Sequence, residues 1–186
     1  MNVLDFYGDR MEEVTINNEK RDNVLVLRRG KSMSPITIAD GRVFTAMPDT
    51  IINSGDLIER NNGERFFIIA KQSSKECVQM QGRRINAVVK LYELTDQYTN
   101  HKKTGVIPVL LRENIPVYYS DVSANMKIYD AGLLPTTVKK IIIDIETNVK
   151  LFQRIELNGK NYQVNNIDTG KYVGLYELQV GEDTRQ

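Results

Sequence analysis

Two Asn-Gly pairs, at residues 62–63 and 158–159, constrain the fold of this chain more than any other feature of its sequence. Each pair lies between two apolar, strand-like segments. Both residues of an Asn-Gly pair accept a positive φ, so the pair is among the strongest local signals for a tight β-hairpin. The sequence therefore predicts two hairpins, one in each half of the chain.

The other apolar segments are also typical of strands. Between residues 140 and 146, three isoleucines (141, 143 and 145) fall on one face and Asp144 and Glu146 on the other, which is the period of a strand with one buried and one solvated face. Short, largely apolar runs at 24–27, 66–70 and 87–94 are separated by turn-forming residues such as glycine and asparagine. We therefore expect an all-β protein.

The two hairpins resemble each other in sequence. In each, Ile-Glu leads to Asn-Gly, then to polar residues, and then to an aromatic residue that begins an apolar strand. The isoleucines are Ile58 and Ile155, and the aromatic residues are Phe66 and Tyr162. This agreement indicates that the chain contains an internal repeat.

A second match, Leu-Tyr-Glu-Leu, occurs at residues 91–94 and 175–178, after each hairpin in turn. An extra loop around residues 73–84 accounts for the unequal spacing. Together the matches predict two copies of one small β-barrel or sandwich unit. Chance agreement between short segments is the alternative.

The polar segment 98–105, which contains a glycine, is the expected linker between the copies. We expect the first β unit at 23–97 and the second at 106–186. Residues 1–22 differ from the rest, and we expect a short N-terminal helix or arm there.

The expected helix depends on four apolar residues with helical spacing. Leu4, Tyr7, Met11 and Val14 are three or four residues apart, which fits one face of a helix. Gly8 lowers the helical propensity of the same segment.

The charge balance argues against a general affinity for polyanions. The chain has 25 basic and 24 acidic residues, giving a formal net charge of +1. Its single cysteine, Cys77, cannot form an intrachain disulfide, and a reducing compartment is the simplest interpretation. The N-terminus lacks the pattern of a secretory signal, and the apolar runs are too short to span a bilayer. We expect a protein made in the cytoplasm without membrane contact.

The residues that normally carry catalysis are scarce. The only histidine, His101, falls in the expected linker, which would hold a general base poorly. The Gly-Lys-Ser sequence at 30–32 has Leu25 where a phosphate-binding loop requires glycine. Strand carboxylates such as Asp144 and Glu146 are typical of a solvated face. We expect no catalytic, cofactor or metal site, and we favour a protein that is not an enzyme.

The hairpin regions carry a family resemblance. Residues 54–69, with Gly-Asp-Leu-Ile-Glu followed by Asn-Gly and an aromatic apolar strand, resemble the small β-barrel of tailed-bacteriophage head-closure (stopper) and head–tail joining proteins. Residues 155–168 resemble it as well, and residues 175–185 resemble the last strand and tail of these proteins. The second copy departs from the pattern, because Phe152-Gln153 replaces Gly-Asp. The chain is also longer than a typical single-barrel stopper.

The resemblance implies a structural virion protein that forms a homo-oligomeric ring around the DNA channel. Its implied partners are further copies of itself, neighbouring portal, adaptor or tail proteins, and packaged DNA through non-specific contact. The implied location is the virion, after assembly in the host cytoplasm. The family has no catalytic residues, so none are transferred to this chain.

Two sets of residues are candidates for these contacts. Basic residues that would face DNA or an acidic neighbour are Arg28, Arg29, Lys31, Arg83 and Arg84. Residues expected between subunits are Leu4, Tyr7, Met11 and Cys77.

Other functions stay open at this point. A tail or baseplate protein of the same kind of particle is one alternative. A non-viral β-barrel module that binds a peptide or a nucleic acid is another. An enzyme that works without His101 is the third.

Overall fold

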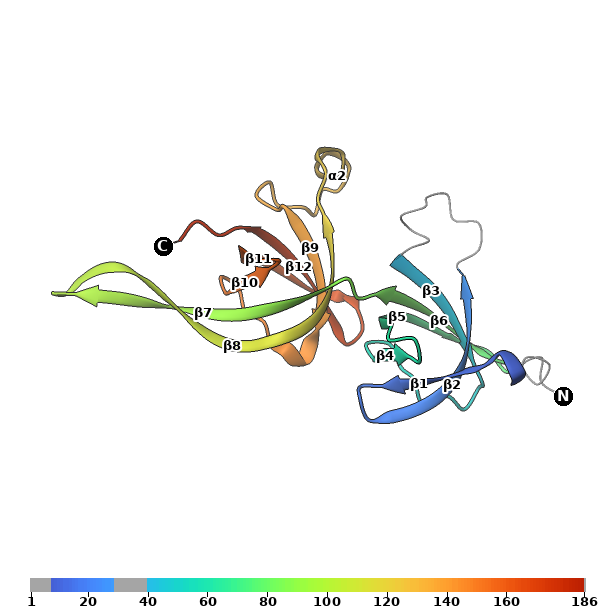
Figure 1. The fold of residues 1–186 in the computed structure, drawn as a ribbon. Helices are drawn as coiled ribbons and strands as arrows, with labels where there is room; N and C mark the ends of the chain where they lie inside the picture. The colour runs from blue at the N-terminus through green and yellow to red at the C-terminus, as the bar shows by residue number, and fades with distance from the viewer. Residues whose placement is uncertain (1–7, 29–39, 186) are drawn as a thin grey trace. The chain divides into compact units, whose positions relative to one another are not determined.

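The computed structural model describes residues 8–28 and 40–185 of the chain. Most of the described chain is β-strand, and it divides into two compact units between Ile85 and Asn86 (Figure 1). In each unit six strands close into a barrel. The expected all-β class with two small barrels is therefore confirmed.

The first barrel contains six antiparallel strands in the order β1-β2-β3-β6-β5-β4, and β4 pairs back onto β1. Because every neighbour is antiparallel, short turns suffice for most connections. The strands are β1 (Glu12–Ile16), β2 (Lys20–Arg28), β3 (Gly41–Ala46), β4 (Leu57–Arg60), β5 (Arg65–Ser73) and β6 (Val78–Arg84).

The second barrel has the order β7-β8-β9-β12-β11-β10, closed by the pairing of β10 with β7. Its strands are β7 (Ala87–Thr99), β8 (Lys102–Asp121), β9 (Lys139–Asp144), β10 (Arg154–Leu157), β11 (Lys160–Tyr172) and β12 (Leu175–Glu182). A short helix, α2 (Ala124–Tyr129), lies between β8 and β9, and a 3-10 turn, η2 (Ile145–Thr147), follows β9.

The two barrels have the same topology. Taken in chain order, the first to sixth strands of each barrel occupy the same positions around it. The hairpin match is reproduced in register, because Ile58 lies opposite Phe66 and Ile155 lies opposite Tyr162. All four side chains are buried. The repeated β unit is therefore present, and the hairpins are equivalent parts of it.

The Leu-Tyr-Glu-Leu match, in contrast, does not join equivalent strands. Residues 91–94 belong to β7, the first strand of the second barrel, whereas residues 175–178 belong to β12, its last strand. The short apolar motif fits any half-buried strand, so its recurrence is not evidence for the repeat. Because residues 91–94 were assigned to the first unit, the predicted end of that unit, residue 97, lies after the observed boundary at residue 85.

The expected linker at 98–105 is the tip of a hairpin. Residues 97–99 pair with residues 102–105, and Asn100 and His101 form the turn between β7 and β8. The boundary between the units lies earlier, at residue 85. The segment reads as a linker because it lies beyond the barrel, where neither face of the strands is buried against a core.

The extra loop expected at 73–84 is mostly strand. Only the turn around residues 74–77 is irregular, and Val78 begins β6. Val78 and Met80 are buried in the first barrel and alternate with exposed glutamines. β6 corresponds in position to β12, so the segment completes the first repeat and does not interrupt it.

The described part of the N-terminal arm expected at 1–22, residues 8–22, belongs largely to strands of the first barrel. Val14 and Ile16 are buried on β1, which pairs with both β2 and β4. The helical spacing is misleading, because Val14 points into the barrel core as a strand residue. A single 3-10 turn at residues 8–10 precedes β1, while Leu4 and Tyr7 lie outside the described residues.

The two Asn-Gly hairpins use different turns. Asn158 and Gly159 both have positive φ, 52° and 74°, as a two-residue type I′ turn requires. At the first pair only Gly63 has positive φ, and its N–H donates to the carbonyl of Arg60. One extra residue, Asn61, lengthens this loop to a type I turn with a glycine bulge.

The first core is closed by an aromatic pair. The rings of Phe44 and Phe66 meet edge to face with centroids 5.3 Å apart, and both side chains are fully buried. Gly82 on β6 leaves room for them, because a Cβ at this position would collide with the ring of Phe44.

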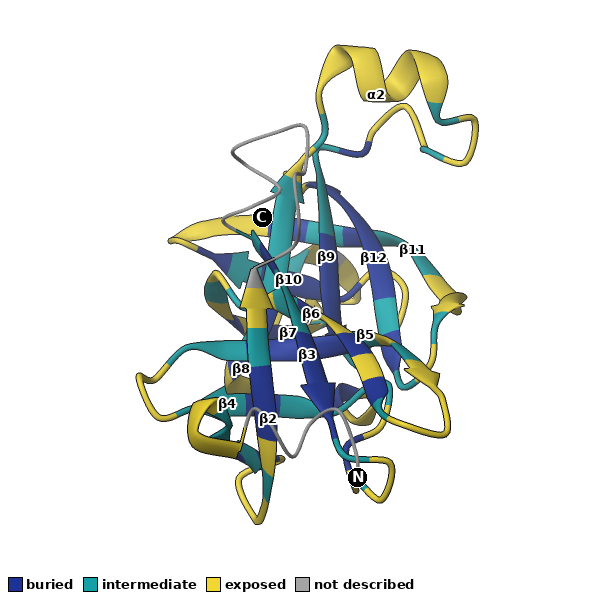
Figure 2. Ribbon diagram, turned by 90° about the vertical axis from the view of Figure 1, so that its right-hand side faces the viewer, coloured by how far each residue is buried: buried dark blue, intermediate teal, exposed yellow. Residues whose placement is uncertain are grey.

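The helix α2 lies outside both cores. None of its residues is buried, and Figure 2 shows it exposed along its length, in contrast to the largely buried β9 and β12. In the part of the chain that the structure describes, no helix has the length and apolarity needed to cross a membrane.

Candidate assembly surfaces

The β7–β8 hairpin extends well beyond the barrel of the second unit (Figure 1). β7 pairs with β10 only over residues 89–92, and β8 pairs with β9 only over residues 118–121. From Glu93 to Thr99, β7 therefore has β8 as its one strand partner among the described residues. At 3.3 Å per residue, this overhang is roughly 20 Å long.

The equivalent hairpin of the first barrel has no such overhang. All five residues of β1 pair with β2, and three of them also pair with β4. The two hairpins end in similar turns: Asn17 and Asn18 have φ of 50° and 62°, and Asn100 and His101 have φ of 51° and 61°. The long hairpin is thus an elongated version of a barrel element that folds without the extension.

The overhang exposes a continuous apolar segment. Residues 106–111 of β8 are Val-Ile-Pro-Val-Leu-Leu. Ile107, Val109, Leu110 and Leu111 are each 46–47% exposed. Because side chains alternate along a strand, this run places apolar groups on both faces of the two-stranded ribbon.

Such a segment is unusual on a protein that works alone. Runs without polar alternation are typical of strands buried on both faces, and an isolated two-stranded ribbon is only marginally stable in water. On β7, Glu93 and Thr95 lie opposite Val109 and Ile107. These two apolar side chains are nevertheless nearly half exposed. The ribbon has the composition of a surface that another polypeptide covers.

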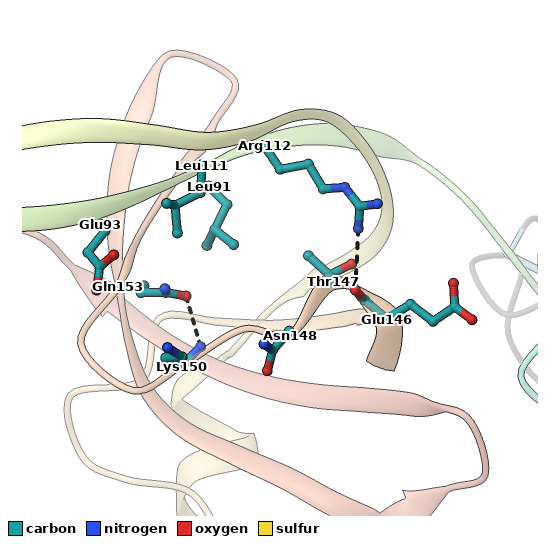
Figure 3. Close-up of a pocket in the computed structure, with 9 residues that line it drawn as sticks. All are labelled: Leu91, Glu93, Leu111, Arg112, Glu146, Thr147, Asn148, Lys150 and Gln153. Carbon is teal, nitrogen blue, oxygen red and sulfur yellow. Dashed lines mark hydrogen bonds between the residues drawn. The ribbon is translucent and has the colours of Figure 1, made fainter.

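A pocket of about 350 Å³ lies at the base of the hairpin (Figure 3). Leu91 and Leu111 supply its apolar wall, while Glu93, Arg112 and Lys150 place charges of both signs around it. The Arg112 guanidinium donates to the backbone carbonyl of Glu146 at 3.4 Å, and Figure 3 shows this bond crossing between β8 and η2. The remaining lining residues are Thr147, Asn148 and Gln153.

The pocket is held by local hydrogen bonds. Gln153 is buried, and its side-chain oxygen accepts the backbone N–H of Lys150 at 2.8 Å. This bond fixes the loop between η2 and β10, which exposes Leu151 and Phe152. The mixed charges fit a contact with a polypeptide better than an enclosed small-molecule site, which is usually mostly apolar.

Two of the candidate basic residues, Arg28 and Arg83, lie at one end of the first barrel. Arg28 on β2 lies opposite Arg42 on β3, and Arg83 on β6 lies opposite Gly41. Arg28 and Arg83 therefore lie at the same end of the first barrel, on strands separated by β3. Arg29 and Lys31 belong to residues outside the described part of the chain.

Arg84 has a partner within the barrel. Its guanidinium lies 3.5 Å from Glu64, which also pairs with Arg60. Burial acts to raise the pKa of Glu64, but the Asn62 hydrogen bond and the two arginines lower it below its ordinary value. Arg42 was not singled out in the sequence, where it is a lone arginine at the start of an apolar strand.

Of the candidate subunit-contact residues, Met11 and Cys77 lie in the described part of the chain, on different segments of the first unit. Met11 is half-buried just before β1. Cys77 is half-buried in the turn between β5 and β6, with its sulfur 3.8 Å from the hydroxyl of Ser74. His101 is exposed at the tip of the long hairpin. Among the described residues, no group of three or more His, Cys, Asp or Glu side chains is arranged to hold a metal ion.

The long hairpin could not be recognised as a candidate surface from the sequence. The apolar run at 106–111 is visible in the sequence, but it reads as one more core strand. It differs from a core strand because the run on β8 pairs with β7 alone among the described strands, which leaves its side chains exposed. Comparison with protein-family models gave no match to this chain, and neither did a search of curated protein sequences.

Proposed function

We propose that this chain is a non-catalytic structural subunit that assembles into a ring with copies of itself, at the head–tail connector of a tailed-phage particle. The resemblance of its hairpin regions to head-closure and joining proteins supports the setting. The observation that carries the assembly role is the exposed apolar run at 106–111 on a hairpin that the barrel does not need.

The internal repeat provides the comparison that supports this role. The first barrel closes with a short β1–β2 hairpin, so the long β7–β8 hairpin adds nothing that closure requires. Exposed apolar patches on soluble proteins commonly mark protein–protein contacts. The β7–β8 extension exposes apolar side chains to water, and the barrel does not need it for closure. A contact between this extension and another polypeptide explains both features best.

The first experiment shortens the hairpin. Tyr92 lies opposite Leu110, so residues 93–109 can be replaced with a two-residue Asn-Gly turn that matches the geometry of this position. We expect the full chain to sediment as an oligomer and the shortened chain as a monomer with a similar unfolding temperature. A matched control replaces only Asn100-His101 with Asn-Gly and leaves the oligomer intact.

Two results would overturn the assembly role. A full chain that stays monomeric at all accessible concentrations contradicts self-assembly. A shortened chain that still forms the same oligomer assigns the contact to another surface. The first result favours the alternative of a binding module, for which the pocket beside Leu111 and Arg112 is the candidate site.

The setting in the particle is tested separately. A cryo-electron-microscopy map of the purified particles should contain a ring of two-barrel subunits at the head–tail junction. A ring found in the tail or baseplate would support the structural role but contradict the proposed position at the head–tail junction. Absence of the chain from the purified particles, shown by mass spectrometry, would contradict a virion role.

A further inference from the structure

The two Asn-Gly pairs have the sequence at which a polypeptide most readily modifies itself. Asparagine is a thermolabile residue, and a following glycine has no Cβ to hinder the approach of its backbone nitrogen to the asparagine side chain. That nitrogen loses its proton and bonds to the asparagine Cγ, the C–N bond of the side-chain amide breaks, and the amide leaves as ammonia. Water then opens the resulting cyclic imide to aspartate or to isoaspartate, in which the backbone runs through Cγ.

The reaction depends on two groups that the fold can hold in place. The ring closes only after the backbone at the asparagine rotates and brings the glycine nitrogen to Cγ. Each hydrogen bond made by the glycine N–H or by the asparagine side chain has to be released for this rotation, and its loss raises the barrier. The two turns of this protein differ in the number of such bonds.

Three hydrogen bonds restrain the first pair. The N–H of Gly63 donates to the carbonyl of Arg60 at 2.9 Å. The side-chain oxygen of Asn62 accepts the N–H of Glu64, and its amide donates to the Glu64 carboxylate, both at 3.1 Å. That carboxylate is itself held by the guanidinium groups of Arg60 and Arg84. Ring closure at Asn62 therefore requires the release of all three bonds.

The second pair has a single long contact. Among the described residues, the N–H of Gly159 has no hydrogen-bond acceptor. The amide of Asn158 donates to the hydroxyl of Tyr119 at 3.4 Å, which is longer than an ordinary N–H···O bond. Both residues of the pair are exposed, and no atom lies within 4 Å of the position of a Cβ on Gly159. Water therefore reaches this turn, and little in the structure opposes ring closure.

We infer that Asn158 is a site of spontaneous deamidation in the folded protein and that Asn62 is protected. The reaction takes up water, releases ammonia and needs no enzyme. The assignment depends on the hydrogen bonds of the two turns, and it is independent of the proposed assembly.

The isoaspartyl product changes the second barrel. The two-residue turn requires a positive φ at both of its residues, 52° and 74° here, and an additional backbone carbon does not fit this geometry. The turn sets the pairing of Leu157 with Lys160. Leu157 is buried and also pairs with Val89 of β7. We therefore expect the isoaspartyl form, separated from the unmodified chain by its added negative charge, to unfold at a lower temperature.

Peptide mapping by mass spectrometry measures both sites in one sample. The purified full chain is incubated at mildly alkaline pH, and the fraction of each Asn-Gly peptide that has exchanged its side-chain nitrogen for oxygen is followed over time. We expect the folded chain to react roughly tenfold faster or more at Asn158 than at Asn62, because three hydrogen bonds have to open at Asn62. In urea, where both turns are lost, the two sites should react at comparable rates.

Exchange of the two turn types tests the cause. Deletion of Asn61 gives Asn62-Gly63 the two-residue loop of the second hairpin, and the rate at Asn62 should rise towards that of Asn158. Insertion of an asparagine between Leu157 and Asn158 gives the second hairpin the longer loop of the first, and it should slow the reaction at Asn158. Circular dichroism establishes that each variant is folded. If a variant does not fold, the comparison of the two sites in the unaltered chain still decides.

Three results would overturn the inference. Equal rates in the folded chain, or a faster reaction at Asn62, would show that these hydrogen bonds do not control the chemistry. A folded chain in which neither site reacts while the urea-treated chain reacts completely would show that the two-residue turn protects Asn158 as well. A folded Asn61 deletion variant in which Asn62 stays as slow as before would contradict the assigned cause.

Discussion

The Nε–H of Arg154 donates a 2.7 Å hydrogen bond to Oδ2 of Asp183, joining the start of β10 to the residue after β12. The carboxylate of Asp183 is inaccessible to solvent and also accepts hydrogen bonds from the side chain and backbone of Arg185. The Arg154 guanidinium donates in turn to the carbonyl of Arg185. These bonds fasten the C-terminal segment across the second barrel.

Replacing this carboxylate should destabilise the second barrel. In Asp183→Asn, Arg154 stays largely buried without its counter-charge, and breaking such a pair typically costs about 3 kcal/mol. Chemical denaturation followed by circular dichroism measures the change in the free energy of unfolding. The matched control is Asp121→Asn, whose carboxylate pairs with Lys139 but is 77% exposed, and which should cost less than about 1 kcal/mol. Equal losses for both variants would contradict the structural importance of Asp183.

The same carboxylate should make stability depend on acid pH. Burial acts to raise the pKa of Asp183, but hydrogen bonds from Arg185 and Arg154 outweigh it and hold the pKa far below its ordinary value. Because the folded-state pKa is depressed, the contribution is complete above the unfolded value of about 4 and is lost as pH falls below it. Unfolding free energies measured from pH 6 to pH 2 should fall less steeply for Asp183→Asn than for the unaltered chain. Parallel curves would show that another carboxylate dominates acid unfolding.

Gly82 should tolerate no side chain. A Cβ there would meet the fully buried ring of Phe44, which is itself packed against Phe66. Overpacking of a closed core typically costs 1–3 kcal/mol, so we expect Gly82→Ala to lower the unfolding free energy of the first barrel by about 2 kcal/mol. Gly8→Ala is the control, because no atom lies within 4 Å of the added methyl group. A neutral Gly82→Ala would mean that the Phe44 ring has room to move.

Asn61 should be dispensable. Deleting it leaves Asn62-Gly63 as a two-residue loop like Asn158-Gly159, while Ile58 and Phe66 keep their pairing. We expect a change in unfolding free energy of less than about 1 kcal/mol, measured by thermal or urea denaturation. Deleting Arg65 is the contrasting variant, because a one-residue slip moves the buried side chains of β5 to the solvent face. Severe destabilisation by the Asn61 deletion would contradict the equivalence of the two hairpins.

The parts of the fold that were predictable depend on local patterns. Ile58 and Phe66, like Ile155 and Tyr162, are set in register by the turn between them, and a turn of this kind is encoded by neighbouring residues. The all-β class and the internal repeat followed from these hairpins. The N-terminal strand was misread because the spacing of Met11 and Val14 fits a helix face by chance, while pairing with the distant β4 decides its state.

The sequence by itself determined which residues form the hairpins and that two similar β units exist, because both depend on contacts within a few residues. Only the tertiary structure decided where the units divide and which apolar strand is left exposed. The run at 106–111 is as apolar as a core strand, and its exposure depends on how far β9 and β10 extend along the barrel. Those strands are far away in sequence, so no local pattern in β8 records that they stop short of it.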